Sequence, residues 1–260
     1  MLQQNLVKQR IAAGEVQFGY LQAIPEPAIT ELMGHVGFDF VMLDGEHSPL
    51  LPAAMENLSR AAEISGICPI VRVPGCHSQD ICRLLDAGAA GIILPNVRRR
   101  EEVEEAVNAA KYLPAGTRGL SMPRQAGFGA MPMPEFVSYA NENLLITVQV
   151  ETPEALADID SIVAVDGVDV ALLGPLDMSA ALGVLGQFDH PRMVEARQRI
   201  VAACEKHGVT AGTFALSVEQ VEPLIEQGFR FILLGADIMF LRQSAAELLG
   251  SARDSLKETR

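Results

Sequence analysis

The stretch Val148-Gln149-Val150-Glu151-Thr152-Pro153-Glu154 joins an apolar run to the start of a helix. The run from Leu144 to Val150 is rich in β-branched residues, which is typical of a buried strand. The threonine, proline and glutamate that follow Glu151 suit the cap and the first turn of a helix. The stretch therefore predicts a strand that ends on a carboxylate and is followed at once by a helix.

The same pattern recurs in Leu172-Leu173-Gly174-Pro175-Leu176-Asp177-Met178-Ser179, where an apolar run ends in a Gly-Pro turn and then Asp177. Two carboxylates thus follow the carboxyl ends of two successive strands, and in a parallel barrel these ends form the reactive face. Two such oxygen ligands suit Mg²⁺ or Mn²⁺. The alternative is that Glu151 only complements a helix N-terminus and Asp177 only caps one.

Strand-like and helix-like segments alternate along the whole chain. We expect eight strands, at Phe18–Leu21, Phe38–Leu43, Pro69–Val73, Gly91–Leu94, Leu145–Val150, Asp169–Leu173, Val209–Thr213 and Arg230–Leu234. We expect helices at Pro27–Val36, Pro52–Ile64, Ser78–Ala87, Arg100–Tyr112, Pro153–Ala164, Pro191–His207, Val218–Gln227 and Asp237–Leu256. Eight β-then-α units predict an α/β fold, a (β/α)8 TIM barrel, as one domain over residues 1–260. A doubly wound sheet is the second choice, but no GxGxxG follows the first strand.

Composition limits the classes of partner and the compartment. Hydrophobic residues make up 49% of the 260 residues, and the net charge of −13 argues against nucleic acids and anionic membranes as partners. No apolar run reaches the roughly 18 residues of a membrane span, and residues 1–10 are too polar for a signal-peptide core. Four cysteines without a CxxC pair make a zinc site or a disulfide framework improbable, so we expect a reducing cytoplasm.

One segment interrupts the eightfold rhythm. Residues 113–134 are rich in Gly, Pro and Met and carry Arg118 and Arg124. Long insertions of this kind are often functional. We expect a rim over the active site, and the alternative is a solvated loop.

Polar side chains cluster where the expected strands end. Asp44, Glu46 and His47 follow the second strand and Arg72 lies at the end of the third, so they share a barrel face with Gln149, Glu151 and Asp177. Arg72 could clamp a carboxylate, and His47 could transfer a proton near neutral pH.

Two common catalytic devices are missing from this face. None of the lysines falls on an expected strand, so Schiff-base chemistry is disfavoured and a carbanion would need a metal. The chain also lacks the GxSxG motif of serine hydrolases.

Six ordered motifs together resemble the HpcH/HpaI aldolase family of class II, metal-dependent pyruvate aldolases. They are Phe38-Asp39-Phe40-Val41-Met42-Leu43-Asp44-Gly45-Glu46-His47, Val71-Arg72-Val73-Pro74, Gly116-Thr117-Arg118-Gly119, Val148-Gln149-Val150-Glu151, Gly167-Val168-Asp169 and Gly174-Pro175-Leu176-Asp177-Met178-Ser179. The resemblance implies a modified TIM barrel in which Glu151 and Asp177 bind Mg²⁺, Mn²⁺ or Co²⁺. It implies that Arg72, Gln149 and the backbone around Gly174 and after Pro175 hold the substrate, with His47 as general base.

The implied reaction is the reversible aldol cleavage of a 4-hydroxy-2-oxo acid to pyruvate and an aldehyde. This chain departs from the family pattern at Asn96 and Arg98, at Ser121-Met122-Pro123 and at Phe214, which we expect to follow the seventh strand. These departures lie where the aldehyde half would bind, so the resemblance leaves the aldehyde open.

The resemblance also implies a homohexamer, built as a dimer of trimers. Asp86, in the last turn of its helix, would reach His47 of a neighbouring subunit, and the final helix would be exchanged between subunits. That helix is apolar at Ile238, Phe240, Leu241, Ala245, Leu248 and Leu249. The alternative is a solvated Asp86 and a final helix that closes its own barrel.

Two other functions compete with the aldolase. The first is a Claisen-type synthase that makes citrate for siderophore assembly, since this reaction can use the same metal site. The second is a binding barrel without catalysis, which predicts a missing ligand or base. The chain retains Glu151, Asp177, Arg72 and His47.

Overall fold

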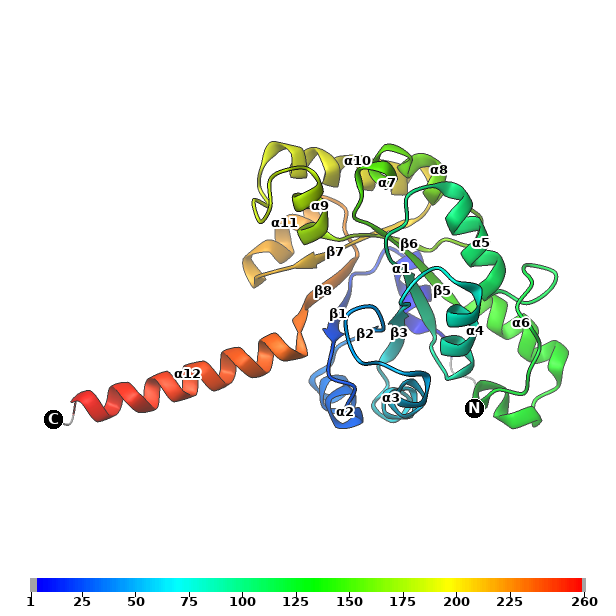
Figure 1. The fold of residues 1–260 in the computed structure, drawn as a ribbon, viewed down its shortest axis with the longest axis horizontal. Helices are drawn as coiled ribbons and strands as arrows, with labels where there is room; N and C mark the ends of the chain where they lie inside the picture. Colours follow the sequence, from blue (N-terminus) through cyan, green and yellow to red (C-terminus); the bar gives the residue numbers. More distant parts are fainter. Residues whose placement is uncertain (1–3, 259–260) are drawn as a thin grey trace.

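The computed structural model describes residues 4–258 and is built around a closed barrel of parallel strands that follow one another in chain order (Figure 1). The strands are β1 (Gln17–Gln22), β2 (Phe40–Asp44), β3 (Cys68–Arg72), β4 (Gly91–Leu94), β5 (Leu145–Val150), β6 (Val170–Leu173), β7 (Thr210–Ala215) and β8 (Phe231–Ala236). β8 pairs with β1 and closes the barrel. The predicted TIM barrel is confirmed.

Helices surround the barrel and cover its strands (Figure 1). They are α1 (Leu6–Ala12), α2 (Pro27–Val36), α3 (Pro52–Ser65), α4 (Ser78–Asp86), α5 (Arg100–Ala110), α6 (Met133–Asn143), α7 (Pro153–Ala157), α8 (Ile159–Val163), α9 (Pro175–Ala181), α10 (Pro191–His207), α11 (Val221–Glu226) and α12 (Asp237–Glu258), with 3₁₀ turns η1 (Arg124–Gly129) and η2 (Val218–Gln220). Pro occupies the first turn of several of them, where its missing N–H is not needed.

Apolar residues form one core inside the barrel and another between the barrel and its helices. Inside, the rings of Phe40 and Phe231 stack with centroids 3.9 Å apart. Val7 and Ile11 of α1 belong to this inner core, so α1 packs against one end of the barrel. Because both faces of each strand are covered, most of the strand residues are apolar and buried.

Several expected elements differ in detail. The helix expected over Pro153–Ala164 is two short helices, α7 and α8, separated at Asp158, whose φ of −99° and ψ of 16° leave the helical range. The helix expected over Val218–Gln227 is η2 followed by α11. Helices α1, α6 and α9 were not expected; α1 and α9 are only seven residues long, and so short a segment gives a weak periodic signal.

The expectation that residues 113–134 form a rim over the active site of the same chain was wrong. The segment follows α5 and precedes α6 and β5, so it lies where helices return the chain to the amino ends of the strands. An insertion over the reactive face must instead leave the carboxyl end of a strand. The segment packs locally, with Ala126 buried against Tyr112 and Phe136 of α6.

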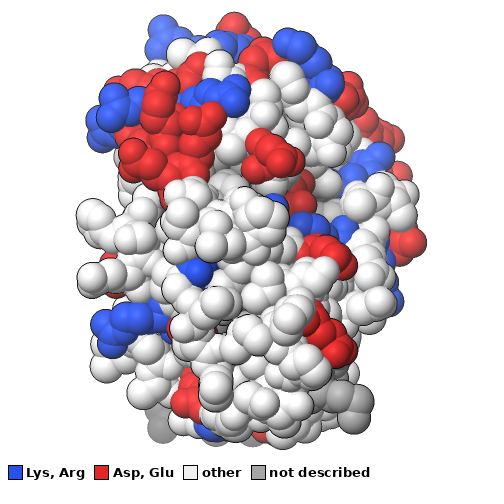
Figure 2. Space-filling model, turned by 90° about the vertical axis from the view of Figure 1, so that its right-hand side faces the viewer, with Lys and Arg blue, Asp and Glu red and all other residues white. Residues whose placement is uncertain are grey.

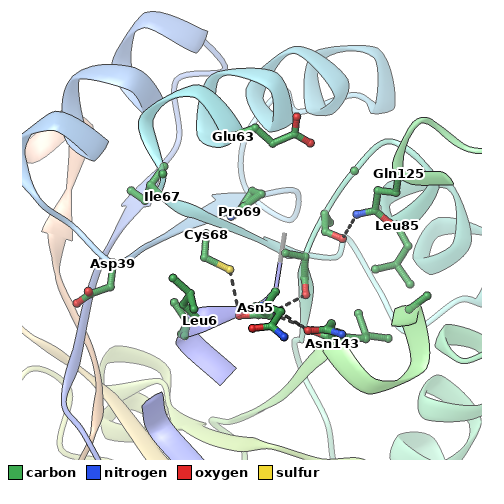
Figure 3. Close-up of a pocket in the computed structure, with 18 of the residues that line it drawn as sticks. Asn5, Leu6, Asp39, Glu63, Ile67, Cys68, Pro69, Leu85, Gln125 and Asn143 are labelled. Atoms are coloured by element: carbon green, nitrogen blue, oxygen red, sulfur yellow. Dashed lines mark hydrogen bonds between the residues drawn. The ribbon is translucent and has the colours of Figure 1, made fainter. Parts of the chain in front are cut away.

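A cavity of about 550 Å³ also lies at the amino ends of the strands, beside α1 (Figure 3). Asn5 projects into this region and donates from Nδ2 to the carbonyl oxygens of Ala90 and Asn143. The Sγ of Cys68 contacts Asn5 Oδ1 at 3.5 Å. This cavity is therefore separate from the carboxyl-end residues that the sequence singles out.

The last helix, α12, begins against the barrel and then projects away from it (Figure 1). Its first residue, Asp237, is buried and accepts hydrogen bonds from the N–H groups of Ala23 and Ile24 at 3.1 and 2.9 Å. Phe240 packs against Tyr20 and Phe38. Beyond it, apolar side chains at Leu241, Leu248, Leu249 and Leu256 are exposed. The alternative that α12 closes its own barrel is wrong.

Charge is unevenly distributed over the face formed by α4, α5 and α6. Figure 2 shows charged side chains gathered toward its upper part and a largely uncharged lower part. Leu113, Leu120, Met122 and Phe128 of the segment between α5 and α6 are exposed apolar residues.

Among residues 4–258, no helix is both long and apolar enough to cross a membrane.

Candidate active site at the carboxyl ends of the strands

The structure brings the predicted polar residues to one end of the barrel. Asp44 and Arg72 are the last residues of the neighbouring strands β2 and β3, and they are register partners. Gln149 lies in β5, and Glu151 is the first residue after this strand. Asp177 lies in the first turn of α9, after β6. Because all strands are parallel, residues at these ends share one face of the barrel.

Arg72 is buried and is held by two carboxylates. Its Nε and Nη2 contact Asp44 Oδ1 and Oδ2 at 3.0 and 2.9 Å, which is a bidentate pair, and its Nη1 lies 3.3 Å from Glu46 Oε2. Burial alone would raise the pKa of Asp44, but Arg72 and the N–H groups of His47 and Glu46 outweigh burial and lower this pKa. The arrangement fixes the guanidinium plane.

Glu46 connects three groups around the mouth of the barrel. Its carboxylate contacts Arg72, accepts a 2.7 Å hydrogen bond from Asn96 Nδ2, and lies 3.7 Å from His47 Nε2. The His47 side chain itself is 69% exposed. The imidazole is therefore open to a bound molecule.

Glu151 is buried and held from two sides. Its Oε1 accepts a 2.7 Å hydrogen bond from the backbone N–H of Asn96, and its Oε2 accepts one of 2.5 Å from Gln149 Nε2. Burial raises the pKa of Glu151, and the nearby charges of Asp177 and Glu46 raise it further. Gly174 adjoins this carboxylate, since a Cβ at residue 174 would stand 2.9 Å from Glu151 Oε2.

The residues present fit a hard divalent ion that takes only one or two ligands from the protein. Residues 4–258 contain no cluster of three or more His, Cys, Asp or Glu side chains placed to hold a metal. The carboxylates of Glu151 and Asp177 are near enough for the charge of one to raise the pKa of the other. Mg²⁺ commonly uses one or two carboxylates and completes its shell with water and substrate, so this pair suits it better than it suits zinc.

Two predicted contacts, those of Phe214 and of the Gly174 N–H, take a different form. Phe214 does not follow β7 but lies within it, and its side chain packs against the inner core. The N–H of Gly174 donates to the carbonyl of Val150, and Pro175 has no N–H. A substrate carboxylate could then use the backbone N–H groups of Leu176 and Asp177, because the first turn of a helix lacks internal acceptors.

Asp86 lies away from His47 of its own chain. Its carboxylate bonds to Arg118 Nη2 at 2.5 Å and to Ser121 Oγ at 3.3 Å, and its side chain remains 37% exposed. The guanidinium of Arg118 lies 4.6 Å from the ring centroid of Tyr112. Asp86 therefore has a partner within its own chain, in the segment that the sequence analysis assigned to the rim.

The role of Asn96 in holding this site was missed. Asn96 follows β4 with a φ of 53°, which is uncommon for a residue other than glycine. The residues on either side of Asn96 do not predict this backbone conformation. An asparagine two residues after a strand end was the available clue, since Asn tolerates left-handed backbone.

Comparisons with known proteins identify the family of this chain. A model of the family HpcH/HpaI aldolase/citrate lyase matches residues 18–244. The chain is 36% identical over 253 residues to the 5-keto-4-deoxy-D-glucarate aldolase of Enterobacter sp. (strain 638), covering 95% of this chain and 96% of that protein.

Solved structures give the same result. The HpcH/HpaI aldolase from Desulfitobacterium hafniense DCB-2 superposes with a TM-score of 0.91 at 30% identity, covering 95% of this chain and 96% of that one. The citrate synthase SbnG superposes with a TM-score of 0.88 at 30% identity, covering 96% and 98%. Relatives named as aldolases cleave carbon–carbon bonds, so the protein is a carbon–carbon lyase. The chain belongs to the HpcH/HpaI aldolase/citrate lyase family.

Proposed function

We propose that the protein is a class II, metal-dependent aldolase that reversibly cleaves a 4-hydroxy-2-oxo acid to pyruvate and an aldehyde. The observation that supports this most directly is the continuous set of contacts from Arg72 through Glu46 and Asn96 to Glu151. It joins an anion-binding guanidinium to a carboxylate that suits a divalent ion. An oxo acid presents an anionic carboxylate and an adjacent keto oxygen, which are the two groups such a site can hold.

Glu151 and Asp177 would bind the metal, which we propose to be Mg²⁺, Mn²⁺ or Co²⁺. When bound, such an ion supplies Lewis-acid polarisation of the keto oxygen. Glu151 is restrained by Asn96 and Gln149, so its ligand oxygens are oriented before the ion arrives.

Arg72 and Gln149 would hold the oxygens of the substrate. A guanidinium has five N–H groups, and the contacts of Arg72 with Asp44 and Glu46 use three of them. The remaining two can stabilise negative charge that develops on the keto oxygen. The Oε1 of Gln149 is buried and has no hydrogen-bond partner among the described residues, so it can accept from a substrate hydroxyl.

His47 would exchange the proton of the substrate 4-hydroxyl, directly or through a water. Its exposed ring can approach a molecule bound above Arg72, and its Nε2 lies 3.7 Å from Glu46 Oε2. Its backbone N–H is fixed by Asp44 Oδ1 at 3.2 Å. The loop is therefore anchored while the side chain is free to move.

The proposed assembly is a homohexamer, a dimer of trimers, in which Asp86 reaches His47 of a neighbouring subunit. Asp86 keeps an exposed edge although Arg118 holds it. The exposed apolar residues Leu113, Leu120 and Met122 near it, and the apolar side chains along α12, are surfaces that an assembly would bury. Arg118 and Ser121 would travel with Asp86 to the neighbouring site.

Mixed oligomers test the shared site. His47→Ala and Asp86→Ala proteins are each expected to be inactive, and after dissociation and joint reassembly some sites would regain both residues. Recovered activity supports the shared dyad. No recovery in mixtures that mass spectrometry shows to contain both chains would rule it out.

Activity is tested with purified protein, pyruvate and a panel of aldehydes, with and without EDTA. The cleavage direction uses 5-keto-4-deoxy-D-glucarate, the substrate named for the relatives, beside simpler 4-hydroxy-2-oxo acids. We expect turnover that EDTA abolishes and a divalent ion restores. Turnover unaffected by EDTA would contradict the metal-dependent mechanism.

The second candidate is a Claisen-type citrate synthase, which the likeness to SbnG favours. It would use the same residues to activate an oxo acid but would take an acyl-CoA as the second substrate. Citrate formation from acetyl-CoA and oxaloacetate, compared with the pyruvate–aldehyde reaction, separates the two.

A further inference from the structure

Asn96 connects the two sides of the site, one around Arg72 and Glu46 and the other around Glu151. Its backbone N–H reaches Glu151, and its side-chain amide reaches Glu46, each at 2.7 Å. Glu46 in turn contacts Arg72 and lies beside His47. One residue therefore touches both the proposed metal ligand and the group that holds the proposed anion clamp.

The backbone of Asn96 is in an unfavourable conformation. Its φ of 53° places it in the left-handed region, which most residues with a side chain avoid. Such strain persists only where the surroundings over-determine it, and it is frequent at functional sites. In this conformation the backbone N–H of Asn96 donates to the buried carboxylate of Glu151.

Asparagine meets both requirements of this position. It tolerates left-handed backbone better than most residues, and it carries an amide that can donate to a carboxylate. Glycine would meet only the first requirement. Glutamine would keep an amide but lacks the tolerance.

We propose that Asn96 is a positioning residue that fixes Glu151 through its backbone and Glu46 through its side chain, and so sets the distance between metal and anion clamp. This inference rests on the proposed function, because it assigns Glu151 to the metal and Arg72 to the oxo acid. Asn96 does not touch the reacting atoms. The contribution of each contact can be measured by comparing two variants.

Two variants separate the contacts. Asn96→Gly retains the N–H and the left-handed backbone but removes the amide, whereas Asn96→Ala removes the amide and also disfavours the backbone conformation. Glycine is thus the matched control for alanine. Mn²⁺ binding without substrate is measured by titration calorimetry, and pyruvate α-proton exchange is followed by NMR.

We expect Asn96→Gly to bind Mn²⁺ like the wild type and to raise the KM for pyruvate by about threefold to tenfold, the usual effect of one lost hydrogen bond, with a smaller change in kcat. We expect Asn96→Ala to bind Mn²⁺ about tenfold more weakly than Asn96→Gly. Equal Mn²⁺ affinity in the two variants would overturn the backbone role. An unchanged KM in Asn96→Gly would overturn the side-chain role.

A wild-type protein that binds no Mn²⁺ would refute the proposed function and leave a separate test of the contacts. Thermal unfolding is then compared for Asn96→Gly, Glu46→Gln and the double variant. If the two residues are coupled, the double variant should lose less Tm than the two single variants lose together, by about 2–4 °C. Additive losses would overturn the inference independently of any activity.

Discussion

A methyl group at residue 174 should weaken metal binding without disturbing the fold. Gly174 has φ −87° and ψ 94°, which any L-residue can adopt, so alanine introduces no backbone strain. Its Cβ would stand 2.9 Å from Glu151 Oε2, 3.1 Å from Glu151 Cβ and 3.2 Å from Gln149 Nε2. The whole effect of Gly174→Ala therefore falls on the Glu151 side chain and its neighbour.

The carboxylate has little freedom to give way. Asn96 holds Oε1 at 2.7 Å and Gln149 holds Oε2 at 2.5 Å, so a shift of a few tenths of an ångström strains one of these bonds. Displacing a ligand through its supporting residues typically reduces metal affinity by about 10–100-fold. This corresponds to about 1.4–2.7 kcal/mol of binding free energy.

The assay is Mn²⁺ titration calorimetry on substrate-free Gly174→Ala, with circular dichroism to verify the fold. Gly250→Ala is the matched control, because a Cβ there meets no heavy atom within 4 Å and an alanine stabilises a helix. We expect normal affinity in the control. If Gly174→Ala, correctly folded, kept its affinity to within about twofold, far below the usual effect, Glu151 would not be the ligand.

Four further outcomes are expected. Arg72→Lys should slow pyruvate α-proton exchange by about 10²–10³-fold, because lysine keeps the charge but loses the fork; unchanged exchange in NMR would remove Arg72 from the mechanism. Burial, with the charges of two glutamates, raises the pKa of Cys76 to about 11, so its alkylation by iodoacetamide at pH 8, followed by mass spectrometry, should be about 10²-fold slower than that of free cysteine. Arg118→Met should destabilise the protein by about 2 kcal/mol in urea unfolding, since it removes the bond to Asp86 and a cation–π contact; a loss below that of Asp86→Asn would contradict this. The pKa of Asp44 is lowered in the folded protein. Its carboxylate therefore stabilises the fold above the unfolded pKa of about 3.9, and this contribution is lost as the pH falls through the folded pKa. In urea unfolding, the stability difference between wild type and Asp44→Asn should shrink below about pH 4.

Local sequence patterns were sufficient to predict the barrel. Apolar runs such as Leu145–Val150, bounded by caps and turns, identify strands buried on both faces, and their alternation with helices leaves few topologies. The same logic placed Glu151 and Asp177 at one end, because the side chains that follow parallel strands share a face. The family resemblance, carried by ordered motifs, is confirmed by the match over residues 18–244.

Contacts between distant residues depended on the tertiary structure. The pairing of Asp86 with Arg118, 32 positions along the chain, follows from how the segment after α5 folds across the amino ends of the strands. The left-handed turn at Asn96 likewise accompanies contacts with two carboxylates from distant parts of the chain, Glu46 and Glu151. An asparagine permits this conformation, but the sequence around it is not sufficient to predict it, because the contacting carboxylates come from the ends of other strands.

The last helix separates the two kinds of information most clearly. Its apolar residues and its start at Asp237 could be read from the sequence, since helical periodicity is local. Its direction could not, because that is fixed by contacts of Asp237 with the backbone of Ala23 and Ile24 and by the packing of Phe240 on Tyr20. Sequence alone thus determined which residues are apolar and which end of the barrel carries the carboxylates, whereas long-range packing decided where the helix points and how those carboxylates are held.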